Sequence, residues 1–133
     1  MPFVLDASIC AVWALTDESD PLADRAMAHL AHEPAMVPTL WWFEIRNVLT
    51  ISERRKRLTR DGSQEFLKFL GGFPIWTDVE PDENAIFGLA RRYQLSFYDA
   101  TYLEIAERKK LPLATLDKAL RVAAEAAGVP LLA

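Results

Sequence analysis

Phe3-Val4-Leu5-Asp6-Ala7-Ser8 (residues 3–8) is the stretch that decides the fold, because an apolar run ends there abruptly at a carboxylate. Residues 3–5 are β-prone and lack polar alternation, which indicates a strand buried on both faces of a parallel sheet. In open α/β sheets ligands bind beyond the carboxyl ends of the strands, so Asp6 occupies a position where chemistry is expected. The alternative is that Asp6 or Ser8 only caps the helix that follows.

Short apolar runs alternate with longer helical patterns along the rest of the chain, which predicts βα units around a parallel sheet. The predicted strands are 3–5, 35–37, 74–79, 111–115 and 129–132, and Pro130 places the last one at an edge. The predicted helices are 8–16, 21–31, 38–52, 59–70, 81–93, 96–110 and 117–127. We expect an α/β fold with a single domain over residues 1–133.

Composition indicates a soluble globular protein, with 51% hydrophobic and 26% charged residues among 133. No apolar run approaches the roughly 20 residues of a membrane span, and the N-terminus lacks a signal segment, so we expect a cytoplasmic protein without membrane contact. A single Cys10 cannot form an internal disulfide, and we interpret it as a core residue. The four tryptophans are expected in core or dimer packing, with stacking on RNA bases as the alternative.

The charge distribution is uneven. A net charge of −4 argues against a nucleic-acid partner, but five of the seven residues from 54 to 60 are basic. These cations could help to hold an anionic substrate, or they could only solvate a helix end and complement its dipole. Asp78, Glu80, Asp82 and Glu83 are interpreted as solvated or first-turn acids without a chemical role.

Four other carboxylates form a pattern. Asp6 and Asp117 follow apolar strands, while Glu44 and Asp99 lie on inward edges of predicted helices. Each has a local explanation, such as a capping box of Ser96 with Asp99, or a partly exposed position for Glu44 beside a groove. If all four converge to about 5 Å, each pair repels by roughly 3 kcal/mol at an effective dielectric constant of ~20. Such convergence requires protonation or bound cations.

Oxygen ligands without nearby Cys or His favour Mg²⁺ or Mn²⁺ over zinc. One or two such ions could orient and deprotonate a water and neutralise charge on a phosphodiester, so hydrolysis of a nucleic-acid backbone is the predicted reaction. Ser8 and Thr115 are small hydroxyls beside the acids, and we expect them to hold a carboxylate or a water in place.

Five segments together resemble the PIN-domain ribonucleases, specifically the VapC-type toxins of toxin–antitoxin pairs. They are FVLDAS (3–8), VPTLWWFEIRNVL (37–49), LSFYDATYLEIA (95–106), LATLDKAL (113–120) and GVPLL (128–132). The resemblance covers nearly the whole chain in the family's order.

The resemblance implies a metal-dependent endoribonuclease with Mg²⁺ or Mn²⁺ as cofactor. The residues that it implies are the catalytic acids Asp6, Glu44, Asp99 and Asp117, the supporting residues Ser8 and Thr115, and a metal held by Asp6 and Asp99, with Glu44 and Asp117 bound directly or through water. It further implies a three-layer α/β/α fold with a central parallel sheet of about five strands. The implied partners are structured RNA (tRNA or ribosomal RNA), a second copy in a homodimer, and an antitoxin whose C-terminal segment covers the acidic groove.

Two alternatives remain open at this point. The same acids would serve a nuclease that acts on DNA or in RNA processing without an antitoxin. A phospho-acceptor domain would instead use Asp6 with a second acid two positions on, but Ser8 stands there.

Overall fold

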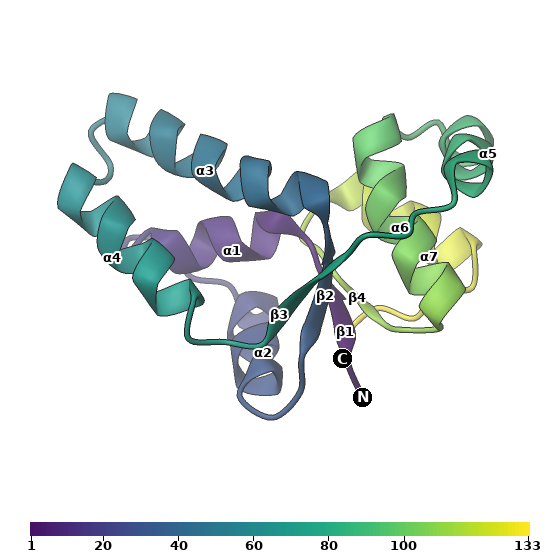
Figure 1. The fold of residues 1–133 in the computed structure, drawn as a ribbon, viewed down its shortest axis with the longest axis horizontal. Coiled ribbons are helices and arrows are strands. Elements are labelled where there is room, and N and C mark those ends of the chain that lie inside the picture. The colour runs from purple at the N-terminus through teal and green to yellow at the C-terminus, as the bar shows by residue number, and fades with distance from the viewer.

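The computed structural model describes residues 1–133 and contains seven helices and four strands (Figure 1). In chain order they are β1 (Phe3–Leu5), α1 (Ala7–Ala14), α2 (Pro21–Leu30), β2 (Ala35–Pro38), α3 (Thr39–Arg54), α4 (Arg60–Leu70), β3 (Ile75–Asp78), α5 (Glu83–Tyr93), α6 (Phe97–Lys109), β4 (Leu113–Ala114) and α7 (Lys118–Ala126).

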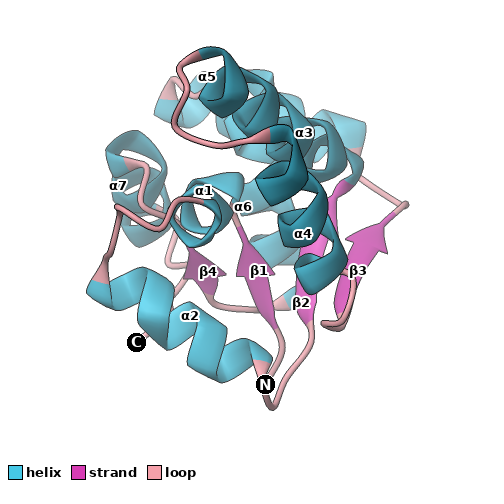
Figure 2. Ribbon diagram, turned by 90° about the vertical axis from the view of Figure 1, so that its left-hand side faces the viewer, coloured by secondary structure: helices cyan, strands magenta, loops and turns pink.

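The sheet is parallel throughout, with the strand order β3-β2-β1-β4. Figure 1 shows α1 to α4 on one side of the sheet and α5 to α7 on the other, and Figure 2 shows the strands side by side with α1, α2 and α4 in front. The predicted three-layer α/β/α architecture is therefore confirmed. All three residues of β1 are fully buried, as the unbroken apolar run predicts.

The sheet has four strands rather than about five. The segment predicted as a last strand contributes one isolated bridge, between Leu131 and Leu113. The Leu113 amide donates to the Pro130 carbonyl, and the Leu132 amide donates to the Leu113 carbonyl, each over 2.9 Å. Pro130 has no amide hydrogen with which to extend this ladder, so the pairing stops at a single bridge.

Helix α5 also begins later than predicted. Asp82 occupies its N-cap position and accepts from the Ala85 amide at 3.1 Å, so Pro81 lies before the helix and does not open it. An N-cap aspartate satisfies an amide at the helix start that has no partner within the helix, which decides the boundary here.

The core contains 33 buried hydrophobic residues, among them the fully buried Cys10. The tryptophans divide between core and surface: Trp41 is buried and Trp13 packs against the core, but Trp42 and Trp76 are exposed. Core packing therefore explains only the first two. No helix has the length and apolar character that crossing a membrane requires.

Candidate active site

Asp6 lies at the carboxyl end of β1, where the parallel register brings it beside the end of β4. Leu5 pairs with Ala114, and the Asp6 amide donates to the Ala114 carbonyl over 3.0 Å. The Asp6 residue is 6% exposed, and its Oδ2 accepts from Ser8 Oγ at 2.6 Å and from Thr115 Oγ1 at 2.7 Å. Although Asp6 occupies the N-cap position of α1, its side chain accepts no capping hydrogen bond. The capping alternative is wrong for Asp6.

Ser8, in the first turn of α1, and Thr115, in the loop that follows β4, hold the ends of β1 and β4 together. The Leu116 amide donates to Ser8 Oγ at 2.9 Å, and the Asp117 amide donates to Thr115 Oγ1 at 3.0 Å. Both hydroxyls thus accept from amides of the loop after β4 while they donate to Asp6. Because Ser8 Oγ accepts from a distant loop, it does not serve as a cap of α1 either. The structure brings both predicted supporting residues onto the carboxylate that they were expected to hold.

Glu44 reaches the site from the second turn of α3 and is held by Tyr102 of α6. The Tyr102 hydroxyl donates to Glu44 Oε1 at 2.5 Å, and the phenol is fully buried while Glu44 is half-buried. Tyr102 was not among the predicted site residues, so its role as a donor to Glu44 was missed. The available signal was its spacing, since residues three apart lie on one face of a helix.

Asp99 and Asp117 lie at the starts of two helices. Ser96 Oγ accepts from the Asp99 amide at 3.0 Å, so the serine half of the predicted capping box is present. Asp117 Oδ1 accepts from the Leu120 amide at 2.8 Å and thereby caps α7. Asp117 therefore has a structural role as the N-cap of α7, whatever else it does.

The acids influence one another electrostatically. Burial raises the pKa of Asp6, against the opposing effect of the two hydroxyls that donate to it. Burial also raises the pKa of Glu44; the hydrogen bond from Tyr102 lowers it, and the charges of Asp6 and Asp99 raise it further. For Asp99, burial raises the pKa first, and the charges of Asp117 and Asp6 add to the effect. The four acids therefore share one region at the carboxyl edge of the sheet.

The acids do not form a closed metal-binding cluster, because no group of three or more His, Cys, Asp or Glu side chains is arranged to hold an ion. Glu44 and Asp117 are instead directed by Tyr102 and by the Leu120 amide. The four acids thus lie in one region without forming a closed set of ligands. The donor set still fits a hard divalent cation, because its side chains supply carboxylate oxygens without a competing thiolate or imidazole.

A cluster of ion pairs at the end of β3 was not predicted from the sequence. Arg108 of α6 contacts Asp78 Oδ2 at 2.7 Å and Glu104 Oε2 at 2.6 Å, and Lys109 lies 3.9 Å from Asp78. The amide of Asp82 donates to Glu104 Oε1 at 3.2 Å. The prediction that Asp78 is solvated is wrong, since its side chain is 5% exposed. The spacing of Glu104 and Arg108, four residues apart on a helix, was the signal for this cluster.

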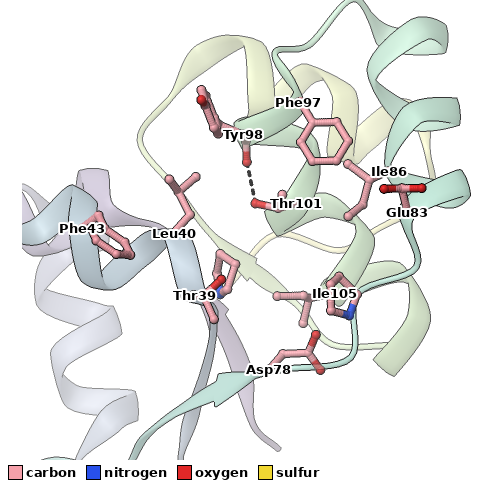
Figure 3. A pocket seen from close by; sticks show the side chains of 12 residues that line it. Thr39, Leu40, Phe43, Asp78, Glu83, Ile86, Phe97, Tyr98, Thr101 and Ile105 are labelled. Carbon is pink, nitrogen blue, oxygen red and sulfur yellow. Dashed lines mark hydrogen bonds between the residues drawn. The ribbon is translucent and has the colours of Figure 1, made fainter.

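A cavity of about 450 Å³ lies between the N-terminal parts of α3, α5 and α6, and none of the four acids lines it (Figure 3). Phe43 and Tyr98 line it, and each directly precedes one of the acids, Glu44 and Asp99. Asp78 lies at the other end of the cavity. The remaining lining residues are Pro38, Thr39, Leu40, Pro81, Glu83, Ile86, Phe97, Thr101 and Ile105. The cavity thus adjoins the helix turns that carry Glu44 and Asp99 without including either carboxylate.

The sequence of this chain is similar to a known protein family and to a named relative. The family described as "PIN domain" matches residues 3–126. Ribonuclease VapC3 from Pyrobaculum aerophilum is 29% identical over 124 residues, which cover 90% of this chain and 92% of the relative.

Two solved structures are similar. The crystal structure of PAE2754 from Pyrobaculum aerophilum has a TM-score of 0.71 and 26% identity, over 92% of this chain and 79% of the other. A toxin-antitoxin complex from Klebsiella pneumoniae gives a TM-score of 0.55 at 19% identity, over 84% of this chain and 82% of the matched chain, and shows the fold alone.

Proposed function

Because this chain belongs to the PIN-domain family, we propose that it is a metal-dependent endoribonuclease and the toxin of a toxin–antitoxin pair. The relative named as a ribonuclease supports the reaction, since it aligns over nine-tenths of this chain. The substrate class is structured RNA, such as tRNA or ribosomal RNA, and the place of action is the cytoplasm.

The observation that carries this proposal is the environment of Asp6. A carboxylate almost without solvent contact is fixed by two hydroxyls, one from the first turn of α1 and one from the loop after β4, and the charges of Glu44 and Asp99 act on the same region. A buried acid that is fixed in this way at the carboxyl end of a parallel strand is placed for chemistry more than for stability. A purely structural role would leave the cost of gathering these charges unexplained.

Asp6 and Asp99 would hold Mg²⁺ or Mn²⁺, with Glu44 and Asp117 bound directly or through water. When bound, the ion supplies Lewis acidity that makes a water a stronger nucleophile and neutralises charge on the phosphodiester. The chain's own residues orient the ligands: the two hydroxyls that donate to Asp6 favour its ionised form. Tyr102 does the same for Glu44, and burial raises the pKa of its phenol so that it stays a donor.

The proposed partners follow from the same site. A C-terminal antitoxin segment would cover the acidic groove, its basic side chains near the acids and its apolar side chains in the neighbouring cavity. A homodimer is the proposed assembly of the toxin. A short reading frame beside the gene that encodes a DNA-binding protein would support the pair, whereas its absence would favour an RNA-processing or DNA-directed nuclease.

The test is cleavage of total RNA by the purified protein with Mg²⁺ or Mn²⁺, with and without EDTA. We expect Asp6→Asn and Asp99→Asn to abolish cleavage while the far-ultraviolet circular dichroism stays unchanged. Asp24→Asn is the matched control, because this exposed aspartate in α2 lies outside the proposed site. Cleavage at the wild-type rate by either site variant would remove the proposal, as would activity that persists in EDTA.

A further inference from the structure

The outer face of α3 carries a stripe of side chains that the catalytic proposal does not use. Trp42, Arg46, Thr50 and Arg54 follow one another at a spacing of four residues, which aligns them along the helix. Trp42 is 52% exposed, and Thr50 and Arg54 are exposed as well. The same helix directs Glu44 toward α6 through its bond to Tyr102, so α3 presents one flank to the site and another to solvent.

One end of the stripe is a preorganised aromatic surface. The Arg46 guanidinium carbon lies 3.9 Å from the centroid of the Trp42 ring, and Arg46 Nη1 donates to the Trp42 carbonyl at 3.0 Å. Phe43 meets the Trp42 ring edge to face at 5.1 Å and is 65% exposed. Flat aromatic and guanidinium groups that remain accessible to solvent are the surfaces on which proteins stack unpaired RNA bases.

The other end of the stripe is basic. Residues 42–60 contain six basic and two acidic side chains, a local charge of +4 in a chain whose net charge is −4. Arg57 is engaged, because it pairs with Asp17 at 3.3 Å and with Glu18 at 3.0 Å. Arg54, Arg55 and Arg60 are exposed and form no ion pair. The cluster predicted from the sequence therefore separates into one structural arginine and a group of unpaired cations.

We propose that this surface, the α3 track, binds a single-stranded segment of RNA outside the cleaved bond. The α3 track consists of Trp42, Arg46 and Arg54 on α3, Arg55 at its C-cap, and Arg60 at the start of α4. Trp42 and Arg46 stack on a base, and the other three arginines contact phosphates. Arg54 follows Glu44 by ten residues, or about 15 Å along the helix. The inference rests on the proposed function, because it names how that same substrate is held.

Charge favours RNA over a second copy of the chain as the occupant. A two-fold interface uses the same patch on both subunits, so a dimer formed through the α3 track would bring the two +4 segments together. Like charges opposed across an interface repel, whereas a polyanion neutralises them and releases its counterions. An RNA strand is thus the partner whose charge complements this surface.

The experiment measures the affinity of fluorescein-labelled single-stranded RNA in EDTA, as a function of salt concentration. Each lost phosphate contact reduces the slope of log K against log salt by about 0.7, so Arg54→Gln, Arg55→Gln and Arg60→Gln together should reduce it by about 2. The matched control is Arg25→Gln, Arg91→Gln and Arg92→Gln, which removes three exposed arginines on α2 and α5. We expect the control to keep the wild-type slope.

The stacking end is tested at one salt concentration. Trp42→Ala should weaken binding by about 5- to 150-fold with the slope unchanged, because a base–aromatic stack contributes about that factor. Trp42→Phe should retain most of the affinity, and thermal unfolding shows whether either variant is folded. If Trp42→Ala does not fold, the comparison of Trp42→Phe with Trp42→Leu replaces it, and equal affinity of these two would exclude stacking.

Three results would overturn the inference: the same slope for the track variant and its control, wild-type affinity of folded Trp42→Ala, or a change of oligomeric state in light scattering with RNA binding intact. The last result would identify the surface as an interface between copies. Because binding is measured in EDTA, the outcome is separate from cleavage. If the wild-type protein binds RNA through the α3 track but does not cleave RNA when Mg²⁺ or Mn²⁺ is present, the proposed nuclease function is wrong and the inference about RNA binding still holds.

Discussion

Replacing Arg108 by alanine should destabilise the fold strongly, because this side chain compensates two buried carboxylates. The side chains of Asp78 and Glu104 are 5% and 2% exposed, and Arg108 contacts them at 2.7 and 2.6 Å. Removing one partner of a buried ion pair costs about 3–5 kcal/mol, since it leaves a charge buried and unpaired. Two carboxylates lose their partner here, which places the cost within this range despite the solvent access of Arg108.

Two features reduce the loss toward the lower end of that range. The Arg108 side chain is 31% exposed, so solvent already screens part of the interaction, and Lys109 lies 3.9 Å from Asp78 as a partial replacement. We therefore expect a loss of about 3 kcal/mol in the free energy of unfolding. For a chain of 133 residues this corresponds to a decrease of about 10 °C in Tm.

Urea unfolding followed by tryptophan fluorescence measures this loss, provided that the dependence on urea stays the same in both proteins. The double variant with Glu104→Gln isolates the pair, because it removes the buried charge together with the arginine, and it should recover part of the lost stability. Arg57→Ala is the control, since its carboxylate partners Asp17 and Glu18 are exposed, and its loss should be much smaller. A loss below about 1 kcal/mol for Arg108→Ala, the range of exposed pairs, would refute the reasoning.

Three further predictions concern the acidic site and its surroundings. Tyr102→Phe should fold but bind Mn²⁺ about 10- to 100-fold more weakly, because Glu44 loses the hydrogen-bond donor that orients it. Calorimetry measures the affinity, and an unchanged affinity would contradict this prediction. Burial raises the pKa of Asp6, so above pH ~4 the native state keeps a proton that the unfolded chain has lost. The Tm of the wild-type protein should therefore fall relative to that of Asp6→Asn as the pH rises from about 4 through the raised pKa. A difference in Tm that does not change with pH would contradict this prediction. Cys10 should resist alkylation until the protein unfolds, since it is fully buried and burial raises its pKa; rapid labelling of the native protein would disprove this.

The sequence alone determined the order of elements and the region of the site. The unbroken apolar run 3–5 predicted a central strand, and parallel strands that end at polar residues predicted where Asp6 and Thr115 meet. These inferences depend on the side-chain periodicity and on the rule that parallel strands end at a common edge. Both are properties of local sequence and of chain direction, so they can be read without coordinates.

Only the tertiary structure decided which side chains are partners. Asp78 reads as one of several solvated acids, but β3 delivers it against Arg108, thirty residues further along the chain. Tyr102 was not predicted to reach the site, yet it donates to Glu44, fifty-eight residues away. The predicted fifth strand is wrong for the same reason. Pro130 indicated that this segment lies at an edge of the sheet, but the sequence did not show that it would form only one bridge. Such pairings depend on how separate elements are oriented across the core, and no local pattern in a single sequence encodes that orientation.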